Sequence, residues 1–417
     1  MPKFIHAADI HLDSPLRGLA RYDGAPVDEI REASRKALKN LVRLALEEKA
    51  DFVVIAGDVF DADWKDYSTG LFFIGQMTKL SQAGIRVYWA AGNHDAISPI
   101  SKSLKLPEGV HVFPTRSFNS IRLDDLGAII HGRSFPSRAV EEDWVPAFPA
   151  PVRGAFNIGI LHTSLSGYAG HDTYAPCSLE SLANKGYHYW ALGHVHKGSV
   201  LNETPRIVFP GNIQGRHIRE TGAKGCWLVT FEDDEVTEAE FRELDVVRWY
   251  NLAVDPKGGN ADDMLFRFRD HLGEVLSDAG GRIAAVRVTV TGACTAHEAL
   301  AKDPEKWRYE IRSAAQIEAG ESVWLEKIIF ATSSSSSQAP DGLLREILDI
   351  IHGSGGSTQI LTENDRSLLK RMLEKLPPEL KMGDDAFSLD NVDWLRDSLT
   401  KGMEHVVASL VDIREER

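Results

Sequence analysis

The chain has 417 residues, of which 43% are hydrophobic and 26% charged, and this length and composition are typical of a soluble globular protein of two or three domains. No run of about 18 apolar residues occurs in the sequence, so no membrane span is expected. The formal net charge of −14 argues against a simple nucleic-acid-binding protein, which usually shows a basic face, although bound divalent metals add positive charge that this count leaves out.

The first half of the chain alternates short apolar runs with amphipathic stretches. A helix is expected from about residue 28 to 49, where Ala33, Leu38, Leu41, Val42 and Ala45 recur at helical spacing. Strands are expected over residues 3–8, 51–56, 86–90, 128–131, 157–162, 188–193, 206–209 and 225–231. Strands separated first by helices and then by shorter connections predict a layered α/β or mixed-sheet domain over residues 1–245.

The pattern restarts near residue 246. Strands are expected over 249–254, 282–291 and 323–330, with a helix over 262–276, which together predict a small α+β domain over residues 246–332. Residues 333–340 are rich in serine and predict a flexible linker. Beyond it, residues 341–417 have helical patterns, and this helical C-terminal region either packs against the body of the protein or binds a partner.

Five short polar segments in the first half carry the chemistry, and nearly all follow an apolar run. They are Asp9 with His11, Asp58 after Gly57, Asn93-His94-Asp95 after Gly92, His162, and His194 with His196 after Gly193. The carboxyl ends of strands are where α/β folds place ligands and catalytic groups. Asp9 and His11 are two residues apart, as are His194 and His196, so an extended backbone would point both members of each pair the same way.

The side chains in these segments predict a metal site. The candidate ligands are Asp9, His11, Asp58, Asn93, His162, His194 and His196. Oxygen and imidazole ligands without thiolate suit manganese, iron, zinc or magnesium. Because one catalytic ion typically keeps about three protein ligands, this set predicts two divalent ions that share Asp58 as a bridging carboxylate. A single histidine of this kind is more often structural, whereas all five segments in order are far more specific.

Two ions of this kind can activate a water molecule and clamp the oxygens of a phosphate, so that no side-chain nucleophile is required. His94, next to Asn93, is the candidate to donate a proton to the leaving oxygen, and Asp95 is the candidate to orient its imidazole. Arg216 and His217, in a Gly-rich turn after the histidine pair, are weaker candidates for substrate binding. Arg216 suits a phosphate-contacting rim, and an ordinary salt bridge explains it equally well.

These segments resemble the calcineurin-like metallophosphoesterase superfamily. The opening Ala-Asp-Ile-His-Leu-Asp at 8–13 and Gly-Asp-Val-Phe-Asp at 57–61 are similar to the SbcD-type DNA repair nucleases. The run Phe-Pro-Gly-Asn-Ile-Gln-Gly-Arg-His at 209–217 resembles more closely the bacterial YhaO group of predicted DNA repair exonucleases. The resemblance covers residues 1–245 well and the remainder only in outline.

The resemblance implies an α/β fold, a four-layer α-β-β-α sandwich followed by a small α+β capping domain. It assigns one metal to Asp9, His11, Asp58 and His196, the other to Asp58, Asn93, His162 and His194, and makes His94 the catalytic histidine. It also implies manganese-dependent nuclease activity on DNA, a homodimer, and a coiled-coil ATPase partner of the SMC type. In one departure, Asp61 stands where archaeal and eukaryotic relatives have a histidine, which brings into question a mechanism that needs that histidine.

The leading hypothesis is therefore a metal-dependent DNA exonuclease or endonuclease, the nuclease subunit of a DNA repair complex. The same ligands would serve a phosphodiesterase or phosphatase acting on nucleotides or other small molecules, which the acidic charge favours. A third hypothesis is a scaffold for an ATPase partner with secondary hydrolytic activity, because a linker precedes apolar C-terminal helices.

The sequence also predicts a cytoplasmic location. The N-terminus enters a strand-like pattern without the apolar stretch of a signal peptide. Cys177, Cys226 and Cys294 are odd in number and far apart, which fits a reducing compartment and argues against a disulfide framework.

Overall fold

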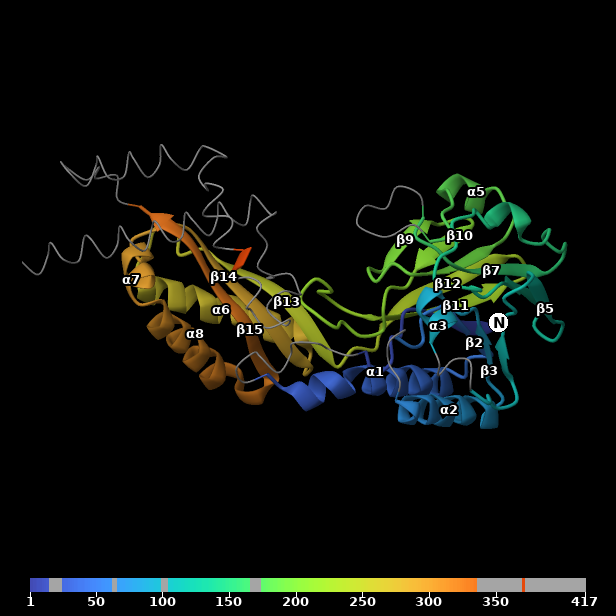
Figure 1. The fold of residues 1–417 in the computed structure, drawn as a ribbon, viewed down its shortest axis with the longest axis horizontal. Helices are drawn as coiled ribbons and strands as arrows, with labels where there is room; N and C mark the ends of the chain where they lie inside the picture. Colours follow the sequence, from blue (N-terminus) through green and yellow to red (C-terminus); the bar gives the residue numbers. More distant parts are fainter. Residues whose placement is uncertain (15–24, 62–65, 99–103, 166–173, 336–369, 372–417) are drawn as a thin grey trace, which may run out of the picture. The chain divides into compact units, whose positions relative to one another are not determined.

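The computed structural model describes residues 1–14, 25–61, 66–98, 104–165, 174–335 and 370–371 (Figure 1). The chain divides into two compact units, the first formed by residues 1–250 and 279–285, the second by residues 251–278 and those from 286 onward. Residues 336–340 of the predicted linker lie outside the described residues, as does the predicted helical C-terminal region except for 370–371. Among the described residues, no helix combines the length and the apolar character needed to cross a membrane.

The first unit contains two six-stranded sheets. The first sheet has the order β12-β11-β1-β2-β3-β4, in which β1 to β4 run parallel and β11 and β12 are antiparallel additions beside β1. Its strands are β1 (Lys3–Ala7), β2 (Phe52–Ile55), β3 (Arg86–Trp89), β4 (Val110–Val112), β11 (Gly225–Glu232) and β12 (Glu235–Glu243).

The second sheet has the order β5-β6-β7-β8-β10-β9. Its four central strands are parallel, and the two edge strands pair antiparallel. The strands are β5 (Asn119–Leu123), β6 (Ala128–Gly132), β7 (Phe156–His162), β8 (Tyr189–Gly193), β9 (Ser199–Asn202) and β10 (Arg206–Phe209). The central parallel strands of both sheets are buried on both faces and mostly apolar, as expected of strands between two layers.

Alternate residues of these strands enter different cores. On the outer face of the first sheet, Ile5 and Val53 pack with Leu41 of α1 (Val27–Glu47) and Met77 of α2 (Tyr67–Gln82), and Figure 1 shows both helices beneath this sheet. Between the sheets lie the large aromatic side chains Phe4, Phe52, Tyr88, Phe156 and Tyr189.

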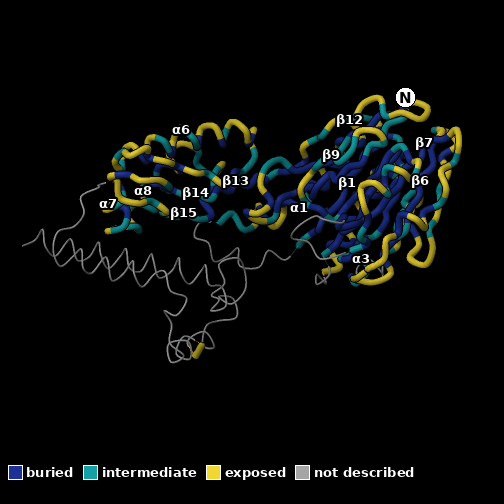
Figure 2. The backbone as a smooth tube through the Cα atoms, turned by 90° about the horizontal axis from the view of Figure 1, so that it is seen from above, coloured by how far each residue is buried: buried dark blue, intermediate teal, exposed yellow. Residues whose placement is uncertain are grey.

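The outer face of the second sheet is covered by a thinner layer. Leu182 of α5 (Leu179–Ala183) and Val145 of η2 (Val145–Ala147) pack there with Trp190. Figure 2 shows the central strands of this unit buried and many of the connecting loops exposed. The four-layer α-β-β-α sandwich expected from the sequence is therefore confirmed, with the fourth layer formed largely by short helical turns and loops.

Helix α2 was not predicted. Its sequence contains Gly70 and Gly75, which lower helix propensity by roughly 1 kcal/mol each, and it is stabilised instead by burial of Phe73, Met77 and Leu80. Asp66 supplies the N-cap, because its carboxylate accepts a hydrogen bond of 2.8 Å from the backbone N–H of Ser68. An Asp before an apolar run was the signal that could have identified this helix.

The second unit is built around a three-stranded sheet of order β13-β14-β15, of which the first residues of β13 and β14 belong to the first unit. It comprises β13 (Val247–Val254), α6 (Ala261–Ala279), β14 (Ile283–Cys294), α7 (His297–Lys302), α8 (Pro304–Ala319), η3 (Gly320–Ser322) and β15 (Val323–Ser334). Helices α7 and α8 were not predicted. Their apolar pattern is weak, because α7 buries only Leu300 and α8 only Ile311, Ala314 and Ala315. Strand β15 includes Ser333 and Ser334, the first two residues of the predicted linker.

Candidate metal centre

All seven candidate ligands lie at or just beyond the carboxyl end of a strand. Asp9 and His11 follow β1, Asp58 follows β2, Asn93 begins α3 (Asn93–Ile97) after β3, His162 ends β7, and His194 and His196 follow β8. Six of them form two groups, Asp9 with His11 and His196, and Asp58 with His162 and His194; within each group, one ligand atom from each residue lies within 4.8 Å of the others. The members of each group are residues that the family resemblance assigns to the same ion.

The sequence predicted an extended backbone for the pairs Asp9/His11 and His194/His196, and this prediction is wrong for both. Asp9, His11, Asp58 and His194 have φ values of 50°, 43°, 51° and 101°, the left-handed region that residues with a Cβ rarely adopt. Strand β1 ends at Ala7. The segment after β1 then runs beside the segment after β2, where the N–H of His11 donates to the carbonyl oxygen of Asp58 at 3.0 Å. Such strained positions cluster at functional sites.

The glycines that precede Asp58, Asn93 and His194 are required by close contacts in the site. A Cβ at Gly57 would lie 2.2 Å from His162 Nδ1, and a Cβ at Gly92 would lie 2.3 Å from Asp58 Oδ1. A Cβ at Gly193 would lie 1.8 Å from the carbonyl oxygen of Ala56. Only glycine fits where backbone or ligand approaches this closely.

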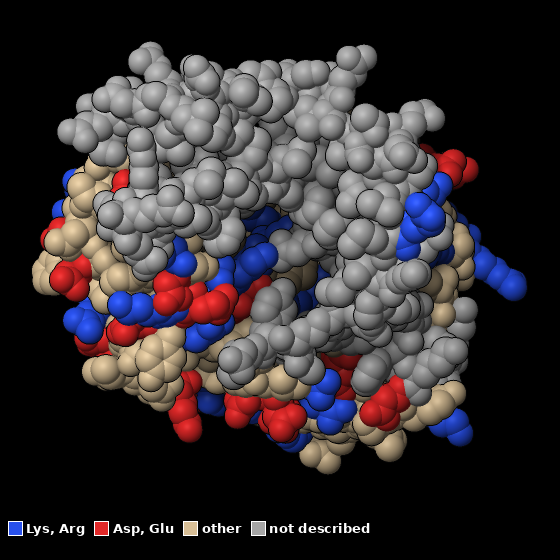
Figure 3. Space-filling view, turned by 60° about the vertical axis from the view of Figure 1, so that its left-hand side comes forward, with Lys and Arg blue, Asp and Glu red and all other residues tan. Residues whose placement is uncertain are grey.

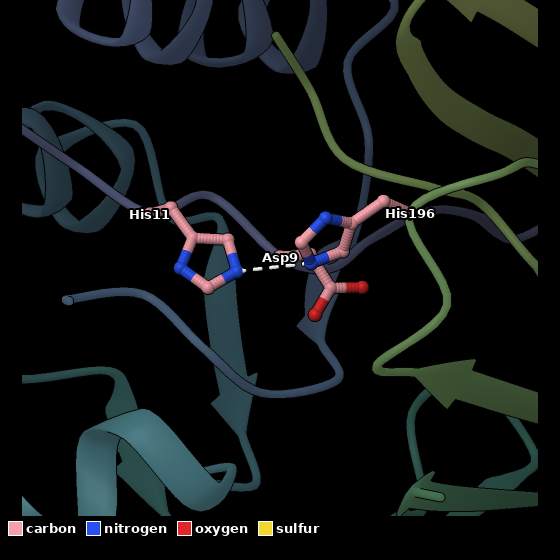
Figure 4. A group of neighbouring side chains, drawn as sticks. All are labelled: Asp9, His11 and His196. Atoms are coloured by element: carbon pink, nitrogen blue, oxygen red, sulfur yellow. Dashed lines mark hydrogen bonds between the residues drawn. The ribbon is translucent and has the colours of Figure 1, made fainter. Parts of the chain in front are cut away.

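In the first group, two imidazoles face each other (Figure 4). His11 Nε2 lies 3.1 Å from His196 Nε2. Because His196 Nδ1 donates to Glu220 Oε1 at 2.7 Å, its Nε2 presents a lone pair, and two ring nitrogens at this distance must share a proton or bind a common cation. The fully buried carboxylate of Asp9 accepts from the N–H of His194 at 2.9 Å. These donors fit a divalent cation.

The second group has the same property. His162 Nδ1 donates to the carbonyl oxygen of Ala56 at 3.0 Å, so its Nε2 is the nitrogen available to a metal. That Nε2 lies 2.8 Å from Asn93 Oδ1 and 3.3 Å from Asp58 Oδ2. The other oxygen of Asp58 accepts from the N–H of His94 at 2.9 Å, and the carboxylate is 1% exposed. Buried oxygen and nitrogen donors converge here too, which again fits a cation.

The electrostatics of the site follow from burial and mutual proximity. Burial raises the pKa of Asp9 to about 6 and lowers that of His11 to about 3. Burial opposes the charge of Asp58, but the charge of His162 outweighs it and the pKa of Asp58 falls below its usual range. Burial also opposes the charge of His162, but the carboxylate of Asp58 raises its pKa to about 9.

The imidazole of His94 contacts the carboxylate of Asp61. His94 Nδ1 lies 2.8 Å from Asp61 Oδ1, with the two side chains 33% and 14% exposed. Burial lowers the pKa of His94, but the hydrogen bond to Asp61 outweighs burial and the pKa is raised. Burial likewise works against the charge of Asp61, yet the nearby imidazoles of His11 and His94 bring its pKa below the usual range.

The prediction that Asp95 orients His94 is therefore wrong. The Asp95 carboxylate accepts from the backbone N–H groups of Val59, Phe60 and Gly92 at 3.0–3.2 Å and from Trp89 Nε1 at 3.3 Å. Adjacent residues of a helix point in different directions, so Asp95 faces the core and joins the connections after β2 and β3. Burial raises its pKa to about 7.

Arg216 and His217 occupy different surroundings. The Arg216 side chain is 18% exposed and its Nη2 donates to Glu220 Oε1 at 3.1 Å, which corresponds to the salt-bridge alternative. His217 is 51% exposed, with Nε2 3.6 Å from Glu220 Oε1. Sequence reasoning missed both Glu220 and the contact between Asp61 and His94, although Asp61 follows Asp58 in the same short segment.

Comparison with known proteins identifies relatives. Residues 2–198 match the family described as calcineurin-like phosphoesterase, and residues 249–333 match the middle domain of the metallophosphoesterase YhaO. The chain is 32% identical over 400 residues to an uncharacterized metallophosphoesterase, YhaO, of Bacillus subtilis, a match that covers 94% of this chain and 95% of the relative.

Two more distant similarities follow. Over 307 residues the chain is 25% identical to the DNA double-strand break repair protein Mre11 of Methanopyrus kandleri, with coverage of 66% of this chain and 63% of the relative. Among solved structures, a dimetal phosphatase from Danio rerio aligns with a TM-score of 0.36 and 12% identity, covering 58% of this chain and 97% of that one.

Proposed function

The chain belongs to the calcineurin-like metallophosphoesterase family, and we propose that within this family it is a manganese-dependent DNA nuclease of a DNA repair complex. The observation that carries the proposal is the pair of ligand groups beside His94, a partly exposed imidazole held by Asp61. A metal-activated water and a positioned proton donor are the two requirements of phosphodiester hydrolysis. DNA as the substrate class is supported by the similarity to a double-strand break repair protein.

The residues that would hold the metals are those of the two groups. Asp9, His11 and His196 would bind one ion, Asn93, His162 and His194 the other, and Asp58 both. Nitrogen and oxygen ligands of this kind suit manganese. When bound, the two ions would supply a water that ionises near neutral pH and positive charge that stabilises the negatively charged phosphate oxygens.

The chain's own residues then provide positioning and proton transfer. Asp61 holds Nδ1 of His94, so the other ring nitrogen, Nε2, is the one that donates a proton to the leaving oxygen. Glu220 holds Nδ1 of His196, and the carbonyl of Ala56 holds Nδ1 of His162. Each of these partners fixes the tautomer that presents Nε2 to a metal.

Attraction of DNA is expected to come from the metal pair and from a partner rather than from a basic surface. The net charge is −14, and acidic and basic side chains alternate over the described residues of the face in Figure 3. We therefore include in the proposal a coiled-coil ATPase partner of the SMC type that brings DNA to the site, and a homodimer. The three free, buried cysteines support work in a reducing compartment such as the cytoplasm.

The acidic charge favours one other function, a phosphodiesterase or phosphatase that acts on nucleotides or other small molecules. The metal ligands and His94 would have the same roles, so only the substrate differs. The scaffold hypothesis concerns residues 341–417, nearly all of which lie outside the described residues.

The test is metal-dependent cleavage by the purified full-length protein. Linear DNA labelled at either end is incubated with manganese, magnesium or chelator, beside bis(p-nitrophenyl) phosphate as a small diester. Asp58→Ala and His94→Ala remove a ligand and the proton donor, while Asp124→Ala and His111→Ala are matched controls at exposed positions of the same unit. Manganese-dependent loss of DNA in wild type and controls but not in the site variants supports the nuclease. Turnover of the small diester with intact DNA, also in the presence of an ATPase partner, would leave the small-molecule enzyme.

A further inference from the structure

Two carboxylates outside the ligand set hold imidazoles of the site. Glu220 accepts from Nδ1 of the metal ligand His196 at 2.7 Å, and Asp61 lies 2.8 Å from Nδ1 of His94. The two carboxylates come from distant parts of the sequence: Asp61 follows β2 of the first sheet, and Glu220 lies in the connection from β10 of the second sheet to β11 of the first. Any group that contacts both would couple the metal ligand to the proton donor.

The guanidinium of Arg216 makes this contact. Its Nη2 lies 3.1 Å from Glu220 Oε1, and its Nη1 lies 3.8 Å from Asp61 Oδ2. Nη2 is also 3.2 Å from His196 Nδ1. The positive charge is therefore between the carboxylate that orients His196 and the carboxylate that orients His94.

The segment that carries Arg216 holds it firmly. Glu220 Oε2 accepts from the backbone N–H of Arg216 and from Asn212 Nδ2, both at 2.8 Å, and Glu220 is 6% exposed. Lys224 Nζ donates to the carbonyl oxygen of His196 at 3.0 Å. The segment over residues 210–224 thus contacts His196 through hydrogen bonds to both its ring and its backbone.

We propose that Arg216 is a positioning residue that couples the metal ligand His196 to His94 by pairing at once with Glu220 and Asp61. This inference rests on the proposed function, because it assigns a role in the same reaction. It differs from a substrate-contacting role, in which the guanidinium would be directed to the phosphate rather than engaged by two protein carboxylates.

The chemistry of arginine suits this position better than that of lysine. The guanidinium is planar, permanently charged and has five donor hydrogens in a fixed fork. Two of its nitrogens can therefore serve two carboxylates in different directions, whereas the compact ammonium of lysine would approach one of them closely. Loss of the charge would leave Asp61 and Glu220, 14% and 6% exposed, without the cation between them.

The first arm of the test measures Mn²⁺ binding by titration calorimetry on the full-length protein, which requires no turnover. Glu220→Gln should weaken Mn²⁺ binding by about 10- to 100-fold, the usual effect of losing a carboxylate behind a metal-bound histidine. Arg216→Gln should weaken it by about 10-fold, and the double variant should be no more than about twofold weaker than Glu220→Gln alone. Arg216→Lys should retain only part of the wild-type affinity. The control Arg86→Gln, which removes an ion pair with Asp125 elsewhere, should bind Mn²⁺ as tightly as wild type.

The second arm compares two substrates of the holoenzyme, bis(p-nitrophenyl) phosphate with its good leaving group and a dinucleotide with a poor one. Arg216→Gln should lower kcat about 10-fold more for the dinucleotide, because only that substrate depends on His94. The same change made in a His94→Gln background should add no further difference between the substrates.

Unchanged Mn²⁺ affinity in Arg216→Gln would overturn the proposal. So would fully additive effects when Arg216→Gln is combined with Glu220→Gln and with His94→Gln, or an Arg216→Gln variant in which only KM rises. If the glutamine variant does not fold, Arg216→Lys decides by the same readouts. A wild-type protein that cleaves neither substrate would contradict the proposed function, whereas the Mn²⁺ titration would still decide on Arg216.

Discussion

Replacement of Asp61 by asparagine tests the assignment of the carboxylate behind His94. The substitution keeps size and shape but removes the charge of a group 2.8 Å from His94 Nδ1. A positioned general acid contributes about 10²- to 10⁴-fold to a rate, and loss of its orienting partner removes a large part of that. We expect kcat on DNA or a dinucleotide to fall about 100-fold, which corresponds to about 2.7 kcal/mol of transition-state stabilisation.

The assay separates this role from a general loss of structure by varying the leaving group. With bis(p-nitrophenyl) phosphate, whose leaving group departs without a proton, Asp61→Asn should retain activity within about threefold of wild type. Asp95→Asn is the matched control, because Asp95 bonds to three backbone N–H groups and to Trp89 rather than to His94. It should lower the thermal stability and reduce activity on both substrates alike.

Two results would refute this reasoning. Equal losses of Asp61→Asn on both substrates would mean that Asp61 acts mainly through His11, whose Nδ1 lies 3.5 Å from Asp61 Oδ1. A leaving-group-dependent loss in Asp95→Asn, with none in Asp61→Asn, would restore the assignment made from the sequence.

Three further predictions concern stability. Gly193→Ala should destabilise the protein by about 3 kcal/mol or more, because strain of this kind cannot relax in a packed interior; a Cβ there would lie 1.8 Å from Ala56 O. In the control Gly75→Ala, the added Cβ has nothing within 4 Å, so the melting temperature should stay the same or rise. Equal melting temperatures for the two variants would contradict the close contact between position 193 and Ala56. His6 is fully buried, and burial lowers its pKa to about 3 from the ordinary 6.5. The unfolded chain therefore binds the extra proton between these values, and stability falls by about 1.4 kcal/mol per pH unit below pH 6.5; urea midpoints at pH 7 and 5.5 should show a smaller drop in His6→Gln, and an unchanged drop would contradict a neutral His6. Chelation should lower the melting temperature, since a cation at about 100 times its dissociation constant stabilises by about 2.7 kcal/mol; Asp58→Ala should show no shift on Mn²⁺ addition, and an unchanged shift would contradict the ligand set.

The sequence was sufficient for the family, the sandwich and most central strands, because those strands are apolar runs of four to eight residues whose pattern does not depend on their neighbours. Element boundaries were close for α1 and β10. The helix α2 and the edge strands β4, β5, β9 and β12 were missed, since burial by other segments or pairing with a neighbour stabilises them more than their own pattern does.

The site shows the same division. The ligand residues could be selected by type and spacing, but the left-handed backbone of Asp9 and His11 could not, because it follows from the path of the connection after β2. The partners of the imidazoles were also beyond reach. Glu220 lies 24 residues after His196, and the choice between Asp61 and Asp95 for His94 depends on the direction in which a helical turn presents each side chain.

The two sheets are in close contact where the ligands lie. In the interior they are separated by the rings of Phe4, Phe52 and Tyr189. At the ligand end small residues replace these rings, and a Cβ at Gly193 would lie only 3.1 Å from that of Ala8. The sandwich therefore narrows toward the site, which brings the backbones that carry the ligands together.

Each ligand group draws on both sheets as a consequence. Asp9 and His11 follow a strand of the first sheet and His196 follows a strand of the second, and Asp58 meets His162 and His194 in the same way. A cation in either group would bind across the sandwich, adding to the apolar contacts that hold the sheets together. Metal binding and packing of the two sheets are for this reason expected to be one cooperative process, so that chelation should loosen the whole first unit rather than only the loops that carry the ligands.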